Sequence, residues 1–203
     1  MCPGELQEKK PQDPAWREPV PAYVALGANL GNARTALRQA VQALGELPRT
    51  SVRQLSSLYK TTPLDTDCAD EAPAPGSDYL NAVVAIETGL TAPALLDALQ
   101  AIELQAGRER PYRNAPRTLD LDLLLFGSAR IDSARLTVPH PRMTQRAFVL
   151  VPLAEIAPGQ VCAEALDAVK HQAIERLGGF ESEITLISNR AALTAPGGFL
   201  LLK

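Results

Sequence analysis

The chain has 203 residues, of which 46% are apolar and 21% are charged, so its length and composition fit one globular domain with a full core. They exclude a disordered or fibrous protein, and the net charge of −3 argues against a general binder of nucleic acids. No stretch approaches the roughly 18 apolar residues of a membrane-spanning helix, and the N-terminus lacks the apolar core of a signal peptide.

The first third of the chain predicts a strand, a helix and a second strand. Residues 1–21 contain prolines and charges without apolar periodicity, so we expect a flexible leader there, with the domain beginning at Ala22. The apolar run Tyr23–Leu26 predicts the first strand. Helical spacing follows the capping residue Asn32, and a second strand is expected over about residues 52–60.

The middle of the chain begins with a long acidic loop over residues 61–77, which contains prolines and is too long for a simple hairpin. A third strand is expected over residues 79–88, followed by a helix that Thr91 caps and that ends at Ala106. Residues 117–126 then predict a fourth strand.

The end of the chain predicts two short helices, around residues 146–155 and 164–177, and residues 184–187 could add a strand. The order β-α-β-β-α-β predicts an α+β fold, a ferredoxin-like βαββαβ sandwich with additional C-terminal helices. We expect the main domain to span residues 22–158, with residues 159–203 as a C-terminal extension that packs on, or trails from, the same domain.

The charge along the middle of the chain changes sign at residue 108. Residues 61–107 contain no Lys or Arg, whereas every cation in residues 108–146 is an arginine. The planar guanidinium group pairs bidentately with phosphate oxygens, so this run favours a bound phosphate ester over a merely solvated basic face. The arginines are Arg108, Arg110, Arg113, Arg117, Arg130, Arg135, Arg142 and Arg146.

A pair of aspartates in the fourth predicted strand is a candidate metal site. Because side chains alternate along a strand, Asp120 and Asp122 face one way and the neighbouring leucines face the other. Two carboxylates on one face suit a hard cation such as magnesium, which also accepts phosphate oxygens. An amphipathic strand with a solvated acidic face would look the same, but the preceding arginines favour the metal site.

Three further features suit either a ligand contact or a structural role. His140 lies between two prolines, whose restricted backbone can aim the imidazole at a ligand or cap a chain end. Gln100 and Glu103 are three residues apart on a predicted helix, so they share one face, toward a ligand or toward solvent. The turn at residues 27–31 matches neither a dinucleotide-binding nor a Walker spacing, and we assign it a structural role before the first helix.

The cysteines indicate a reducing compartment. Cys2, Cys68 and Cys162 are odd in number, far apart and free of CxxC spacing, so they predict neither a disulfide framework nor a zinc site. We therefore expect a cytoplasmic protein. Its expected partners are small molecules, with no nucleic acid and no membrane, and the expected state is a monomer.

Taken together, these residues resemble the 6-hydroxymethyl-7,8-dihydropterin pyrophosphokinases of folate biosynthesis. The resemblance runs from Ala22 to Pro158, and its most specific part is Arg113-Asn-Ala-Pro-Arg-Thr-Leu-Asp-Leu-Asp-Leu-Leu124. The other segments that carry it are residues 24–31, 57–61, 78–81, 100–103, 136–143 and 146–148.

The resemblance implies transfer of a pyrophosphoryl group from ATP to the pterin hydroxymethyl oxygen, with release of AMP. It implies that Asp120 and Asp122 hold two Mg²⁺ ions, and that Arg108 and Arg117 belong to a mobile loop that closes over the phosphates. The pterin would contact Thr61, Leu64, Tyr79, Asn81 and Phe148, with the two aromatic rings on either side of it. ATP would contact Gln100, Glu103, Arg110, Leu123, Arg135, Thr137, His140 and Arg146.

Two features depart from what the resemblance leads us to expect. Some members have Trp where this chain has Asn114, so closure of a ring from that loop would depend on Tyr112 instead. The acidic loop over residues 65–77 is also longer than in compact members.

Two other functions share parts of this pattern. A nucleotidyl or nucleotide-sugar transferase could use the same paired aspartates, but it would release a nucleoside diphosphate or pyrophosphate rather than AMP. A ferredoxin-like RNA-binding module would need aromatic platforms and a basic surface, whereas the chain has only four Phe, four Tyr and one Trp. Product analysis separates the first alternative, and salt-sensitive binding of single-stranded RNA would support the second.

Overall fold

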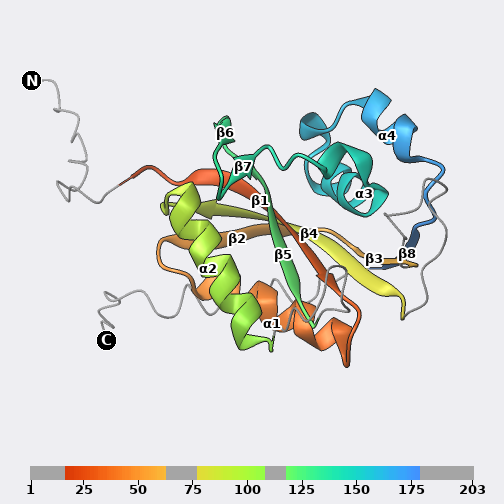
Figure 1. Cartoon of the computed structure of the whole chain (residues 1–203), viewed down its shortest axis with the longest axis horizontal. Helices are drawn as coiled ribbons and strands as arrows, with labels where there is room; N and C mark the ends of the chain where they lie inside the picture. Colours follow the sequence, from red (N-terminus) through yellow and green to blue (C-terminus); the bar gives the residue numbers. More distant parts are fainter. Residues whose placement is uncertain (1–16, 63–76, 108–117, 179–203) are drawn as a thin grey trace, which may run out of the picture.

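The computed structural model describes residues 17–62, 77–107 and 118–178 (Figure 1). The strands are β1 (Val20–Ala28), β2 (Thr50–Leu55), β3 (Leu58–Thr61), β4 (Tyr79–Thr88), β5 (Asp120–Phe126), β6 (Ile131–Asp132), β7 (Thr137–Val138) and β8 (Glu175–Gly178). The helices are α1 (Ala33–Glu46), α2 (Ala92–Gln105), α3 (Ala147–Ile156) and α4 (Ala163–Val169), with short 3₁₀ turns η1 (Met143–Gln145) and η2 (Pro158–Gln160).

The main sheet is built around β1 and β4, which pair antiparallel along the whole of β1. β5 pairs with the other edge of β1, β2 and β3 both pair with β4, and β8 extends the sheet beyond β3. α1 connects β1 to β2, and α2 connects β4 to β5. The structure therefore has the predicted ferredoxin-like βαββαβ arrangement, and the predicted α+β fold class is confirmed.

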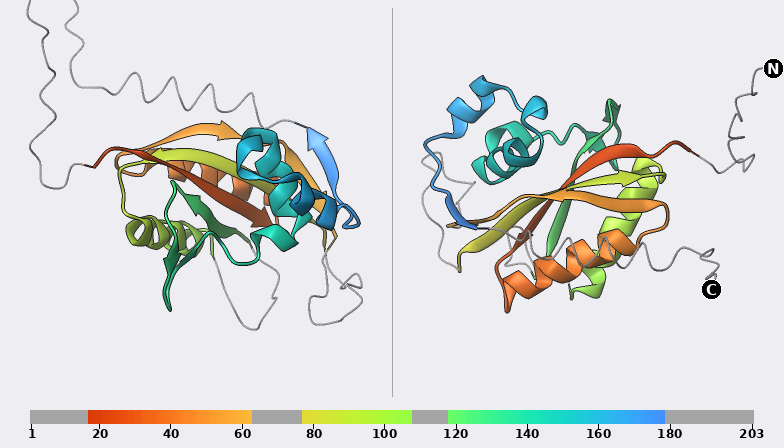
Figure 2. Two further views of the ribbon diagram at one scale, coloured as in Figure 1. Left: turned by 90° about the horizontal axis from the view of Figure 1, so that it is seen from above. Right: turned by 180° about the vertical axis from the view of Figure 1, so that it is seen from behind.

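The two faces of the sheet are covered by different helices (Figure 2). α1 and α2 pack on one face, where Leu26 of β1 shares a buried cluster with Leu37 and Leu99. α3 packs on the opposite face, where Val83 of β4 shares a second cluster with Leu153. Only part of this second face lies under α3, because the apolar cluster stops before the strand ends that carry Asp120 and Asn81.

Both predicted helix caps are present. The Asn32 side chain accepts a hydrogen bond from the backbone N–H of Thr35 at 3.1 Å, and the Thr91 hydroxyl accepts one from Ala94 at 3.3 Å. Each cap satisfies an N–H group that has no partner inside the helix. The helices predicted after these two residues are confirmed, and so is the short helix that forms α3.

The strand predicted over residues 52–60 is divided into β2 and β3 at Ser56 and Ser57, which are fully buried. The backbone N–H of Ser56 donates to the carbonyl of Val83 at 2.9 Å, and the Ser56 hydroxyl accepts from the N–H of Val83 at 2.9 Å. A side-chain oxygen thus replaces a ladder acceptor where the pairing with β4 is interrupted between β2 and β3, which apolar periodicity does not reveal.

The helix predicted over residues 164–177 is wrong in its second half. α4 ends at Val169, and Glu175–Gly178 forms β8 instead. β8 pairs with β3, placing Arg176 opposite Tyr59. The edge of β3 offers unpaired backbone groups to an extended segment, and this long-range pairing overrides the local helical spacing.

Other boundaries differ by a few residues. β1 begins at Val20, inside the predicted leader, because Val20 pairs with Thr88 at the end of β4. The fourth predicted strand begins as β5 at Asp120. β6 and β7, where Ile131 lies opposite Val138, were not predicted, because two residues are too few to show a period.

The extension after residue 158 is integrated as far as it is described. Val169 of α4 is buried against Leu150 of α3, and β8 is part of the main sheet. The domain boundary at this point stays a prediction. Among the described helices, none combines the length and the apolarity that crossing a membrane requires. Cys162 is a free, exposed thiol.

Candidate active site

Three strand ends bring polar residues together on the face that α3 covers only in part. In the register of the sheet, Gly27 of β1 lies opposite Asn81 of β4 on one side and opposite Asp120 of β5 on the other. Residues paired in this way share one face of the sheet. Because Gly27 has no side chain, the row from Asp120 to Asn81 has a gap at its centre, where a Cβ would come 3.4 Å from the Asn81 side-chain oxygen.

The two aspartates of β5 lie on this face, as their alternation predicts. Leu121 and Leu123 are buried in the cluster with α1 and α2, whereas Asp120 and Asp122 are half-exposed on the other face. The Asp122 carboxylate is 38% exposed and lies 4.0 Å from the guanidinium group of Arg146. The site therefore combines two accessible carboxylates with a neighbouring cation.

Glu103 of α2 supports the backbone between the two aspartates. Its side chain is only 1% exposed, and it accepts a hydrogen bond from the N–H of Leu121 at 2.8 Å. Gln100, three residues earlier, is exposed. Glu103 thus turns toward β5 while Gln100 is exposed. The assignment of both residues to an ATP site stays a prediction.

His140 is attached to β5 through its backbone. Its N–H donates to the carbonyl of Leu124 at 2.9 Å, and its Nδ1 accepts from the N–H of Arg142 at 3.2 Å. Burial lowers the pKa of His140 from 6.5, helped by Arg146 and Arg142 and opposed by the nearby aspartates. The imidazole is therefore neutral at pH 7 with its proton on Nε2, which can donate to an oxygen in the site.

Arg146 joins this group from the residue that precedes α3. Its guanidinium carbon lies 5.4 Å from the centre of the Phe148 ring, in a cation–π contact. Arg146 thus lies between the Asp122 carboxylate and the Phe148 ring. Two residues of one short segment, one cationic and one aromatic, are thereby directed at the same end of the sheet.

The predicted pterin residues gather at the opposite side of the same row. Asn81 is only 4% exposed, and its amide group donates to the hydroxyl of Thr61 at 3.0 Å. Tyr79 pairs with Thr61 in the sheet and is half-buried. Because Asn81 uses an amide hydrogen for Thr61, its side-chain oxygen keeps acceptor capacity toward the gap above Gly27.

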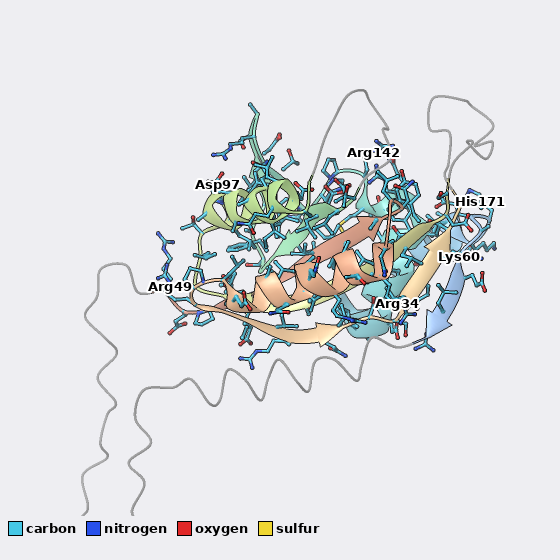
Figure 3. The ribbon with its side chains drawn as sticks, turned by 90° about the horizontal axis from the view of Figure 1, so that it is seen from below. Arg34, Arg49, Lys60, Asp97, Arg142 and His171 are labelled. Atoms are coloured by element: carbon cyan, nitrogen blue, oxygen red, sulfur yellow. The ribbon has the colours of Figure 1, made fainter. Side chains whose placement is uncertain are left out.

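Three further predicted ATP residues lie on β5, on β7 and between β6 and β7. Leu123 is 3% exposed in the cluster with α1 and α2, so its side chain faces away from Asp122. Arg135 is exposed and forms an ion pair with Asp97 of α2. Asp97 lies well away from Arg142, which follows His140 in the chain (Figure 3). Thr137 is half-buried on β7, which packs against β5. For Leu123, a ligand contact would have to come from the backbone of β5.

Several predicted residues lie outside the described residues. They comprise the two loop arginines, one ATP residue, one pterin residue, the aromatic position and its substitute, and most of the acidic loop: Arg108, Arg117, Arg110, Leu64, Asn114, Tyr112 and residues 63–76.

A network that sequence reasoning missed joins Ser57, Tyr59, Glu155 and Arg176. Glu155 accepts from the Ser57 hydroxyl at 2.8 Å, from the Tyr59 hydroxyl at 2.9 Å and from Arg176 at 2.7 Å. One signal was visible, because Glu155 is the only charged residue in the otherwise apolar α3. The positions of its partners depend on sheet pairing and could not be read locally.

The fold and this face define a ferredoxin-like α+β protein with a site suited to phosphate esters, because carboxylates, a guanidinium group and a neutral imidazole converge there. The family model of 7,8-dihydro-6-hydroxymethylpterin-pyrophosphokinase (HPPK) matches residues 23–158. The chain belongs to this family.

Curated relatives agree over nearly their whole length. The chain is 47% identical over 163 residues to a Pseudomonas aeruginosa protein named 2-amino-4-hydroxy-6-hydroxymethyldihydropteridine pyrophosphokinase, covering 77% of this chain and 96% of that protein. It is 46% identical to a Bacillus subtilis protein of the same name, covering 74% of this chain and 86% of that protein.

Solved structures support the fold. An HPPK-DHPS structure in complex with substrates aligns with a TM-score of 0.57 and 13% identity, covering 75% of this chain and 43% of that one. A Plasmodium falciparum HPPK-DHPS triple mutant aligns with a TM-score of 0.54 and 14% identity, covering 86% of this chain and 43% of that one. This chain spans less than half of either solved chain, so the likeness concerns the shared fold alone.

Proposed function

We propose that the chain transfers a pyrophosphoryl group from ATP to the hydroxymethyl group of 6-hydroxymethyl-7,8-dihydropterin, the reaction that its family carries out in folate biosynthesis. The observation that carries this proposal is the row Asp120–Gly27–Asn81, which sets an acidic end beside a polar end on the face that α3 covers only in part. The hydroxymethyl oxygen attacks the β-phosphorus of ATP, and the bond from the β-phosphorus to the oxygen that bridges it to the α-phosphorus breaks. AMP leaves, and the hydroxyl proton passes to solvent.

The acidic end fits magnesium. Asp120 and Asp122 offer hard oxygen ligands on one face of β5. Paired carboxylates suit Mg²⁺, which keeps waters and accepts phosphate oxygens. When bound, Mg²⁺ supplies positive charge to the phosphate oxygens during transfer. We propose two ions, following the family resemblance.

The cationic residues would hold the phosphates in line for attack. Arg146 lies 4.0 Å from Asp122, so a phosphate bound near that carboxylate is within reach of its guanidinium group. Neutral His140 can donate from Nε2 without adding a charge. The proposal extends to Arg108, Arg110 and Arg117, which precede β5 in the chain. Because positioning and charge neutralisation account for most catalysis of phosphoryl transfer, a strong general base is not required.

The polar end would bind the flat pterin ring. The Asn81 side-chain oxygen faces the gap above Gly27 and can accept from ring N–H groups, while the Thr61 hydroxyl is fixed by Asn81. Tyr79 and Phe148 are the aromatic residues available for stacking. Because Arg146 occupies one face of the Phe148 ring, stacking uses the other face or displaces Arg146.

We propose a monomeric, cytoplasmic enzyme, and size-exclusion chromatography with light scattering tests the monomer.

Incubation with Mg-ATP and hydroxymethyl-dihydropterin tests the function, with nucleotides separated by ion-exchange chromatography. We expect AMP to form in a one-to-one ratio with the pterin diphosphate, and no AMP without pterin. Release of ADP or of free pyrophosphate instead would show a different group transfer and would overturn the proposal.

A further inference from the structure

The network of Ser57, Tyr59, Glu155 and Arg176 joins three separate elements on the face that carries the proposed site. Glu155 lies near the C-terminal end of α3, Tyr59 lies on β3, and Arg176 lies on β8. The Glu155 carboxylate accepts from the backbone N–H of Ser57 at 3.0 Å, from both hydroxyls and from Arg176. Arg176 also donates from Nε to the Ser57 hydroxyl at 2.9 Å.

The side chains of this network could not easily be replaced by other hydrogen-bonding partners. Ser57 is fully buried and Tyr59 is 6% exposed, so neither hydroxyl has an easy alternative partner in solvent. Arg176 contacts Ser57 and Glu155 with two different nitrogens of one planar group, which a lysine could not reproduce. Burial raises the pKa of Tyr59 to about 12, together with its hydrogen bond to Glu155. The Tyr59 hydroxyl therefore stays protonated and keeps donating to Glu155.

The network lies beside the pterin half of the proposed site rather than the metal half. Tyr59 pairs directly with Asn81 in the sheet, and Thr61 lies two residues farther along β3. Phe148 lies seven residues before Glu155 on α3, which is two helical turns, or about 10.5 Å, on the same helix face. Holding Glu155 against β3 thus sets the distance between Phe148 and Asn81.

We infer that Arg176 and Glu155 are positioning residues, which clamp α3 to β3 and thereby set the width of the pterin site between Phe148 and Asn81. This inference rests on the proposed function. Arg176 lies beyond residues 23–158, which the family model matches, so β8 is a working part of the enzyme rather than an appended tail. The clamp acts first on pterin binding, because Phe148 belongs to α3 whereas the two aspartates belong to β5. The ATP half is linked to α3 through Arg146, which lies at the start of that helix and contacts Asp122 of β5.

Arg176→Gln tests the inference through the Michaelis constants of the two substrates, measured by AMP release. We expect KM for the pterin to rise about tenfold, equivalent to about 1.4 kcal/mol, while KM for ATP and kcat change by less than about twofold. Arg176→Lys keeps the charge without the planar fork, so its pterin KM should fall between those of wild type and Arg176→Gln. An unchanged pterin KM, or an equal rise in both constants, would overturn the inference.

Glu175→Gln is the matched control. Glu175 is adjacent on β8 and forms an ion pair with Lys60 at 2.9 Å at the junction of β3 and β8 (Figure 3), but it is not part of the network. Its kinetics should match wild type, and a selective rise in pterin KM there would also contradict the inference. If urea unfolding shows that Arg176→Gln does not fold, Arg176→Lys and Ser57→Ala carry the test, each with a rise in pterin KM and an ATP KM within about twofold of wild type. Wild type that forms no AMP refutes the proposed function itself.

Discussion

Asp122→Asn separates the proposed metal site from the stability of the fold, because it removes a charge with little change in shape. The Asp122 carboxylate is 38% exposed and lies 4.0 Å from Arg146, so losing this partly exposed pair costs about 0–1 kcal/mol. In the opposite direction, Asp120 and Asp122 share a strand face about 6.5–7 Å apart. Their repulsion at that separation is about 0.6–2.6 kcal/mol for effective dielectric constants of about 80 to 20.

The two effects oppose each other, so the metal-free variant should lie between about 0.4 kcal/mol less stable and about 2.6 kcal/mol more stable than wild type. Activity should behave differently. Losing charge stabilisation of about 2.7 kcal/mol or more in the transition state lowers kcat/KM by at least about 100-fold. The assays are urea unfolding in the presence of a chelator and AMP formation across a magnesium titration.

Asp167→Asn is the control for removing a carboxylate from an exposed ion pair. Asp167 pairs with Lys170 at 2.7 Å on α4, away from β5, and its loss should leave both stability and turnover unchanged. Full turnover of Asp122→Asn at ordinary magnesium concentrations would remove this residue from the metal site. A large loss of stability in the same variant would show that the carboxylate supports the fold instead.

Two further predictions concern carboxylates that face the protein interior. Glu103→Leu should lower the free energy of unfolding by about 1–3 kcal/mol, because the buried N–H of Leu121 loses its acceptor at 2.8 Å. A change below about 0.5 kcal/mol in urea unfolding would contradict this prediction. Burial alone would raise the pKa of Glu155, but hydrogen bonds from Ser57, Tyr59 and Arg176 hold that pKa below 4.5. A carboxylate whose pKa is lower in the folded state stabilises the fold at pH above its unfolded-state pKa, and this stabilisation is lost as the pH falls through its folded-state pKa. Wild type should therefore lose stability below about pH 4.5, and Glu155→Gln should lose less over the same pH range.

The features predicted correctly are those that depend on local chemistry. Asp120 and Asp122 alternate with leucines inside one strand, so their common face followed from the pleat alone. Asn32 and Thr91 are capping residues in front of apolar helices, and both caps formed. In each case the residues that decide the structure lie within four positions of one another.

The features missed depend on pairing between distant segments. Residues 175–178 form a strand because they pair with the edge of β3, more than a hundred residues earlier in the chain, although their own spacing is helical. Glu103 is buried because α2 packs on β5 and an N–H of that strand needs an acceptor, whereas its spacing to Gln100 indicated only a shared helix face. No local pattern carries this information.

The proposed site also has one half set by local sequence and one half set by contacts between distant segments. Its acidic half rests on β5, where a single strand sets the directions of Asp120 and Asp122 and Glu103 holds the backbone between them. Its pterin half has no such local origin, because Asn81 and Phe148 belong to different elements. Their separation follows from how α3 lies on β3, which Glu155 controls through Arg176 and its other partners. Substitutions in the clamp should therefore affect recognition of the pterin, whereas substitutions on β5 should affect the chemistry on the phosphates.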